Sequence, residues 1–159
     1  MAEAILLMPF YYHVIVMKKM TDSEIRNFLM KGTYTGKLAT IRKNGLPHIA
    51  PIWFILEGDN TNIIFMTWHD SIKAKNIKGN PKVSLCVDDQ TPPFSFVTVE
   101  GTAEIIDEPN DLLRWATSIA ARYMGEENAQ TYGTRNSSEG ELLLRIRPNK
   151  IIGQKDISE

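Results

Sequence analysis

The chain has 159 residues, of which 43% are hydrophobic and 23% are charged, and its formal net charge is −1. Such a length and composition are typical of one soluble globular domain with a sizeable core. The near-zero charge gives no overall basic field, so the sequence predicts neither a nucleic-acid partner nor a membrane partner. The single cysteine, Cys86, excludes an intrachain disulfide and a thiolate metal cage, and a reduced, cytoplasmic location is expected.

The chain begins with an apolar segment. Residues 4–17 are almost entirely apolar, but Pro9 interrupts the run, and it is shorter than the roughly 20 residues that span a bilayer. Met20 then opens a stretch that reads as the start of a domain. We therefore expect residues 1–19 to be an N-terminal extension and residues 20–159 to form a single domain.

The first predicted helix follows this extension. Thr21 and Glu24 have the spacing of a capping box, in which each side chain accepts a hydrogen bond from the other's backbone amide. The apolar residues behind it share one helix face, and Gly32 ends the pattern. These residues are Ile25, Phe28 and Leu29.

Short apolar runs separated by turn signals come next. Asn44-Gly45 lies between two such runs and predicts a β-hairpin in which both residues have positive φ. Gly101 lies inside a long apolar run and predicts a bend or a bulge. The six expected strands lie in residues 34–42, 46–56, 62–68, 82–88, 94–106 and 142–153.

Helices interrupt the strands at two points. Pro109 suits the first turn of a helix over residues 109–124, which has an apolar stripe that includes Trp115 and Ile119. Residues 125–141 are polar, rich in glycine and without period, and predict a loop. Mostly hairpin-linked strands with inserted helices indicate a small antiparallel barrel.

The short helix expected over residues 71–79 is the strongest candidate for a binding element. On a helical wheel the side that holds both isoleucines also holds Lys73, whereas Lys75 and Lys78 fall on the opposite, solvated side. An inward ammonium without a partner is costly, so Lys73 implies an anion. The helix start and the Ser71 hydroxyl favour a phosphate. In the alternative, Lys73 reaches solvent or pairs with an internal carboxylate.

The strand around Pro51 is the second candidate. Residues 48–54 are apolar on both faces, which predicts a central strand, yet Pro51 removes a ladder donor. A bulge, an edge position in the sheet, or a flat ring lying beside the strand would each explain this. The sequence has no nucleotide-binding, metal-ligating or nucleophile motif, so any chemistry would come from a cofactor.

Three strings together resemble one family. They are GKLATIRKNGLPHIAPIWF, TWHDSIKAKNIKGNPKVSL and FVTVEGTAEI, and they are similar to the pyridoxamine-phosphate-oxidase-like flavoproteins. The resemblance implies a mainly β fold with inserted helices, a six-stranded antiparallel split β-barrel. It also implies a homodimer with a flavin at the subunit interface. The cofactor-binding positions that it implies are His48, Ile49, Ala50, Pro51, Ile52, Trp53, Met66, Thr67, Ser71 and Lys73.

The sequence also departs from this family. Ile72 stands where pyridoxamine phosphate oxidases have an arginine, and Phe96 stands where they have a glutamine that contacts the flavin. The resemblance therefore points to the branch that uses FMN or the deazaflavin F420, rather than to vitamin B6 oxidation. The leading expectation is an FMN-dependent oxidoreductase that passes a hydride between reduced flavin and a small planar acceptor. The alternatives are an F420-dependent reductase, a non-enzymatic flavin- or haem-binding protein, and a barrel without a cofactor.

Overall fold

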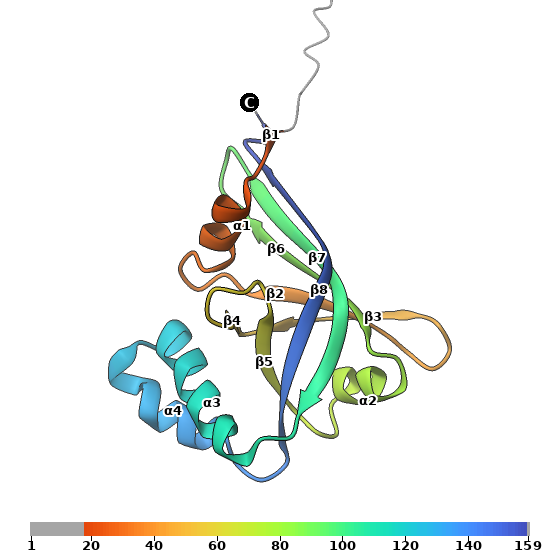
Figure 1. Cartoon of the computed structure of the whole chain (residues 1–159), viewed down its shortest axis with the longest axis vertical. Coiled ribbons are helices and arrows are strands. Elements are labelled where there is room, and N and C mark those ends of the chain that lie inside the picture. The colour runs from red at the N-terminus through yellow and green to blue at the C-terminus, as the bar shows by residue number, and fades with distance from the viewer. Residues whose placement is uncertain (1–17, 159) are drawn as a thin grey trace, which may run out of the picture.

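The structure, a computed structural model, describes residues 18–158 (Figure 1). Most of the predicted extension, residues 1–17, lies outside the described residues. Lys18 and Lys19, the last two residues of the predicted extension, form strand β1, which pairs with the end of the C-terminal strand. No helix in the described part of the chain is long and apolar enough to cross a membrane.

One antiparallel sheet contains all the strands of residues 18–158. The strands are β1 (Lys18–Lys19), β2 (Gly36–Ile41), β3 (Pro47–Ile52), β4 (Phe54–Leu56), β5 (Ile63–Trp68), β6 (Lys82–Asp89), β7 (Ser95–Ile106) and β8 (Glu141–Lys155). The helices are α1 (Asp22–Leu29), α2 (Ile72–Gly79), α3 (Pro109–Met124) and α4 (Ala129–Asn136), with a 3₁₀ turn η1 (Glu126–Asn128) between the last two.

The order of the strands explains why the sheet is a split barrel. It runs β3-β2-β6-β7-β8-β5-β4, and β1 pairs with β8 off this path. The two ends of the order, β3 and β4, are consecutive in the chain and are separated only by Trp53. The curled sheet therefore brings its two ends together without hydrogen-bonding them. The prediction of six strands was wrong: β1 lies in the N-terminal extension and was not among the six, and the run 46–56 breaks at Trp53 into two strands that pair with different neighbours.

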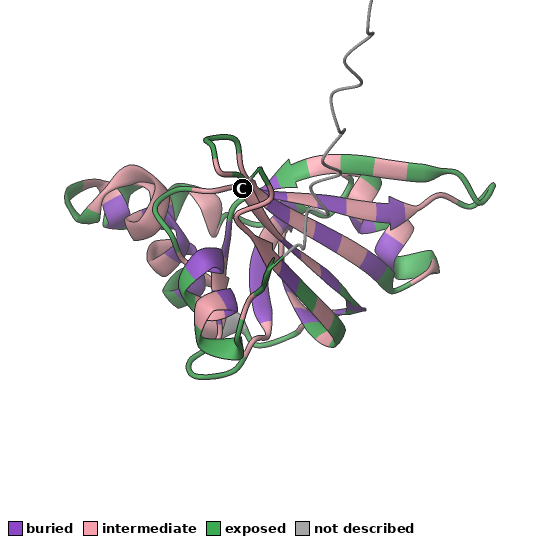
Figure 2. Ribbon diagram, turned by 90° about the horizontal axis from the view of Figure 1, so that it is seen from above, coloured by how far each residue is buried: buried purple, intermediate pink, exposed green. Residues whose placement is uncertain are grey.

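The strands bury alternate residues, as period-2 patterns require. Figure 2 shows buried and partly buried positions alternating along the strands. The main core lies inside the curled sheet and is closed by α1. Its fully buried large side chains include Leu29, Leu38, Phe54, Phe65, Leu85, Leu144 and Ile146.

The predicted capping box is present at α1. The Thr21 hydroxyl accepts from the Glu24 amide at 3.3 Å, and the Glu24 carboxylate accepts from the Thr21 amide at 2.8 Å. The three predicted apolar residues of this helix are buried. This prediction is confirmed.

The two predicted turn glycines have different outcomes. The β2–β3 hairpin is present, but its loop spans residues 42–46, and of Asn44 and Gly45 only Gly45 has positive φ, at 83°. The Asn44 side chain instead accepts from the Leu46 amide at 3.1 Å, which holds a longer loop than the expected two-residue turn. The bulge is confirmed, because the β7–β8 register shifts between Glu100 and Gly101.

The segment predicted as a loop, residues 125–141, instead contains η1 and α4. Its polar sequence has no apolar stripe because α4 packs on α3 through a glycine. A Cβ at Gly133 would lie 2.3 Å from the Thr117 hydroxyl oxygen. Close backbone approach therefore replaces the side-chain packing that a periodic pattern would have revealed. Helix α3 itself has the predicted bounds and packs against β4, β5 and β8.

Candidate functional site

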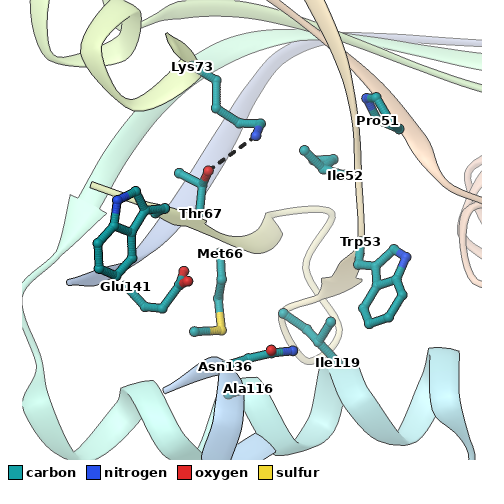
Figure 3. Close-up of a pocket in the computed structure, with 11 residues that line it drawn as sticks. Pro51, Ile52, Trp53, Met66, Thr67, Lys73, Ala116, Ile119, Asn136 and Glu141 are labelled. Atoms are coloured by element: carbon teal, nitrogen blue, oxygen red, sulfur yellow. Dashed lines mark hydrogen bonds between the residues drawn. The ribbon is translucent and has the colours of Figure 1, made fainter. Parts of the chain in front are cut away.

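A cavity of about 310 Å³ lies at the split in the barrel, where β3 ends and β4 begins (Figure 3). Strands β3 and β5 form part of its wall, α2 contributes one residue, and the α3–α4 segment and the start of β8 complete it. The lining residues are Pro51, Ile52, Trp53, Met66, Thr67, Trp68, Lys73, Ala116, Ile119, Asn136 and Glu141.

Lys73 is the cation of this cavity. Its Nζ donates to the Thr67 Oγ1 at 3.2 Å, and Thr67 Oγ1 lies 3.0 Å from the Ser71 hydroxyl. In the described part of the chain no carboxylate lies within ion-pair distance of this amine. Burial lowers the pKa of Lys73, and the charge of Glu141 opposes that effect. The amine is thus partly buried and holds only one hydroxyl partner.

Helix α2 places Lys73 by means of its first turn. Ser71 is the N-cap, and its hydroxyl accepts from the Ala74 amide at 3.2 Å. At the other side of the helix the side-chain amide Nδ2 of Asn76 donates to the Thr40 hydroxyl on β2 at 2.9 Å, which fixes α2 to the sheet. The helix N-terminus, with its positive dipole end, therefore faces the same corner as the Lys73 amine.

The predicted inward face of α2 was partly wrong. Ile72 is 45% exposed, whereas Ala74, which the helical wheel places on the side opposite the two isoleucines, is 1% exposed. The helix packs on the sheet through the small Ala74 side chain and Ile77, and Lys73 lies at the border of that face. Lys75 is exposed as predicted, and it pairs with Asp70 at 2.7 Å.

Strand β3 is an edge strand, not the central strand that its apolar sequence predicted. It pairs only with β2, and Ile49 on its outer side is 65% exposed. Because β3 has no strand partner on its other side within the described residues, the missing N–H of Pro51 costs no ladder hydrogen bond on that side. A plain bulge is not needed to explain this proline.

Aromatic side chains form one end of the cavity. Trp53 is 38% exposed and stacks on Tyr123 of α3, with ring centroids 4.9 Å apart and planes 2° from parallel. The Tyr123 hydroxyl donates to the Tyr34 carbonyl at 2.8 Å and accepts from the Phe54 amide at 3.3 Å. The tryptophan at the split is thus held by a ring that is itself anchored at both sides.

Glu141 is the charged lining residue that the sequence analysis missed. It is the first residue of β8 and lies opposite Trp68 in the β5–β8 register. Figure 3 shows its side chain directed into the cavity near Met66. Burial raises the pKa of Glu141, and the positive charge of Lys73 opposes that rise.

Six of the ten predicted site residues lie together in this cavity, and four do not line it. The six are Pro51, Ile52, Trp53, Met66, Thr67 and Lys73. Ser71 is one hydrogen bond away, through Thr67. His48, Ile49 and Ala50 lie farther along β3, and the His48 Nδ1 is buried without a hydrogen-bond partner in residues 18–158. The role of the ten residues in binding a cofactor stays a prediction.

Five residues of the cavity wall were missed by the sequence analysis, and all but Trp68 come from segments distant in the sequence. Trp68 and Glu141 meet through strand pairing, and Asn136 lies on the helix that was expected to be a loop. Ile119 belonged to the predicted apolar stripe of α3, but no local pattern indicated that it reaches a cavity rather than the core alone. The remaining missed residue is Ala116.

Solved structures with this fold are numerous. A conserved hypothetical protein of Mycobacterium tuberculosis, Rv2991, superposes with a TM-score of 0.75 and 29% identity over 87% of each chain. An F420 reductase gives a TM-score of 0.60 and 24% identity over 79% of this chain and 94% of the other. A FAD-binding protein from Mesorhizobium loti gives 0.65 and 18% identity over 87% and 96%. No curated protein matches the sequence.

A family profile settles the relationship of the chain to known proteins. The profile of pyridoxamine 5'-phosphate oxidase matches residues 21–155, which include every strand from β2 to β8 and all the residues that line the cavity. The resemblance that the three sequence strings indicated is thereby confirmed. The chain belongs to the pyridoxamine 5'-phosphate oxidase family.

Proposed function

We propose that the cavity at the split binds a flavin by its phosphate, with FMN as the first candidate, and that the protein is a flavin-dependent oxidoreductase. The observation that carries this proposal is Lys73, a partly buried cation in the cavity wall with one hydroxyl partner. A phosphate beside it would accept charge-assisted hydrogen bonds from the amine and from the hydroxyls of Thr67 and Ser71. Because a helix N-terminus also favours an anion, the residues fit a phosphate.

The rest of the cavity suits a flat ring. The aromatic side chain of Trp53 and the apolar side chains of Ile119 and Met66 offer an apolar surface next to the polar corner. This division into a small polar part and a larger apolar part is typical of cofactor sites. A bound reduced flavin would supply the hydride for a small planar acceptor. The chain would bind the phosphate, orient the ring and exclude water.

A second copy of the chain would complete such a site. Strand β3 is an open edge with apolar side chains on its exposed side, among them Ile49, and Leu46 in the adjacent loop is 59% exposed. Exposed apolar edges of this kind favour association. The proposed homodimer places the cavity at or near the interface. Sedimentation of the purified protein at two concentrations measures the mass directly, and a monomer at both would contradict the dimer.

F420 is the second candidate because of one further feature. A groove of about 700 Å³ lies beside α2 and is lined by Arg42, Lys43 and Lys75 together with uncharged residues. A deazaflavin with a longer anionic side arm could extend from the phosphate corner into this basic groove. One structural neighbour of the chain is an F420 reductase. FMN has no such side arm and would not extend into the groove, so changes to the groove residues would distinguish the two cofactors.

The test is the absorption spectrum of the purified protein, recorded alone and during a titration with FMN. Saturation near one FMN per chain, with riboflavin binding more weakly, would support a phosphate-anchored flavin site. Oxidised FMN absorbs at longer wavelength than F420, so the same measurement identifies the preferred cofactor. If the protein changes the absorption spectrum of neither FMN nor F420, and does not bind haem either, the proposal is contradicted.

A further inference from the structure

Glu141 is a charged group that the proposed flavin site does not need. Its carboxylate lines the same cavity as Lys73, and it comes from β8 on the far side of β5 (Figure 3). In the described part of the chain it has no ion pair at contact distance and no side-chain hydrogen bond. A half-buried carboxylate that no neighbouring side chain binds therefore places a negative charge in the wall of a proposed anion site.

The charges around Glu141 are few. Lys73 on α2 is the charged group whose field acts on it. His69, in the β5–α2 connection, is a titratable residue next to this strand end, and its backbone amide donates to the Gly140 carbonyl at 2.9 Å. The cavity residues from α3 and α4, such as Asn136, carry no charge. Burial raises the pKa of Glu141, and among the charged groups Lys73 is the one that opposes this rise, so the ionisation of Glu141 responds to what binds beside Lys73.

We propose that Glu141 is a specificity-determining residue of this site, and that a phosphate-bearing ligand binds beside Lys73 only together with a proton on Glu141. This inference rests on the proposed function. The ligand class is a phosphate ester of a flat ring, and the coupled partner is a single proton taken from solvent.

Electrostatics gives the direction of this coupling. Without a bound anion, the ammonium of Lys73 stabilises the Glu141 carboxylate. A phosphate that neutralises the ammonium removes this stabilisation and adds a like charge in a region of reduced dielectric. Burial already favours the neutral form of Glu141. Protonation of Glu141 is therefore the least costly way to admit the anion.

The coupling opposes the titration of the ligand itself. A phosphate monoester has a second pKa of about 6, so the phosphate alone binds a cation better as the pH rises. Glu141 acts in the other direction, because its ionised form at higher pH repels the anion. The two effects can thus be separated by removing one of them.

The experiment measures the dissociation constant of FMN by quenching of flavin fluorescence, from about pH 5 to about pH 8. The proteins are the wild type, Glu141→Gln, and the matched control Glu139→Gln, which alters an exposed glutamate two positions away. Riboflavin serves as the ligand without phosphate. Thermal unfolding of each protein without ligand checks that the variants fold, and Glu141→Asp retains a carboxylate if the glutamine variant does not fold.

The expected result is that Glu141→Gln binds FMN at least about fivefold more tightly than wild type near the upper end of this range, a typical size for coupled sites. The advantage shrinks as the pH falls, and riboflavin shows no such difference. Glu139→Gln follows the wild type, and so does Glu141→Asp. Calorimetry in two buffers of different ionisation enthalpy shows proton uptake with FMN in the wild type and less in Glu141→Gln.

Two results would overturn the inference, and they can be distinguished. If FMN binds with parallel pH profiles in wild type and Glu141→Gln, the coupling is absent although the proposed function stands. If neither protein binds FMN at any pH, the proposed function fails and the coupling fails with it.

Discussion

Two partly buried cations, Arg122 on α3 and Lys73 on α2, have opposite surroundings. Neither has a carboxylate within ion-pair distance in residues 18–158. Arg122 donates to the carbonyls of Phe54, Leu29 and Gly32 at 2.7, 2.8 and 3.0 Å. Its guanidinium also lies over the rings of Phe54 and Tyr123. Lys73 has a single hydrogen bond, to a hydroxyl.

The difference teaches how to distinguish a structural cation from a binding one. Burial lowers the pKa of both groups, so the pKa directions alone do not separate them. The number of side-chain N–H donors that already have an acceptor in the fold does separate them. Arg122 joins the end of α1 to β4 and α3 through main-chain carbonyls, so its donors are occupied by the fold. Lys73 keeps donors free toward a cavity, where a bound ligand can accept hydrogen bonds from them.

Arg122→Met should give the largest effect. The substitution keeps much of the apolar contact but leaves three carbonyls without this donor, so we expect the free energy of unfolding to fall by about 3–5 kcal/mol. Urea denaturation followed by circular dichroism measures it. If Lys73→Met destabilised the protein equally, both cations would be structural and the comparison would not hold.

Lys73→Ala should weaken FMN binding by about 1–3 kcal/mol, the range for a charge-assisted contact. The unfolding free energy should change by less than about 1 kcal/mol, because the lysine makes one hydroxyl contact in the fold. Lys75→Ala is the control on the same helix, since Lys75 pairs with Asp70 at the surface. Titration of each variant with FMN tests the pair, and equal losses would contradict the assignment of Lys73.

Tyr123→Phe should have an intermediate structural effect. It retains the ring that stacks on Trp53 and removes the hydroxyl that bridges the Tyr34 carbonyl and the Phe54 amide. We expect a loss of about 1–2 kcal/mol in unfolding free energy. FMN affinity should fall less than in Lys73→Ala. A larger loss of affinity than of stability would show that the position of Trp53, rather than the charge of Lys73, dominates binding.

The smallest expected effect is a pH dependence of stability without ligand. The folded-state pKa of Glu141 is raised by burial, so the folded chain binds more protons than the unfolded chain between the unfolded and folded pKa values. This contribution to stability is present at pH below the unfolded pKa and is lost as the pH rises through the folded pKa. The melting temperature of Glu141→Gln, compared with wild type across this window, should lack that decline. Identical profiles would place Glu141 in a solvated environment.

The fold was predictable to the extent that its signals are local. The capping box at Thr21, the bulge at Gly101 and the helix over residues 109–124 each depend on neighbouring residues, and each is present. The break at Trp53 was not predictable, because the run 46–56 is apolar throughout and only the pairing of β3 with β2 and β4 with β5 divides it.

The candidate site was half predictable for the same reason. Thr67, Ser71 and Lys73 lie within seven residues of sequence and form one hydrogen-bonded corner. Glu141 reaches this corner only because β8 pairs with β5, a relation that no short pattern encodes. The helical wheel placed Ile72 on the inward face of α2, which was wrong, because an apolar residue in a first helical turn need not face the sheet.

Strand β8 has a consequence for the biosynthesis of the chain. It pairs with β1, β5 and β7, so it is the partner of strands from the beginning, the middle and the later part of the described chain. During translation, the edge of β5 that pairs with β8 has no partner until about eighty more residues have been made, since Ile63 pairs with Ile146. Non-local pairing of this kind slows folding. The barrel therefore closes only after its last strand has left the ribosome, and until then β5 offers an open edge to chaperones or to other nascent chains.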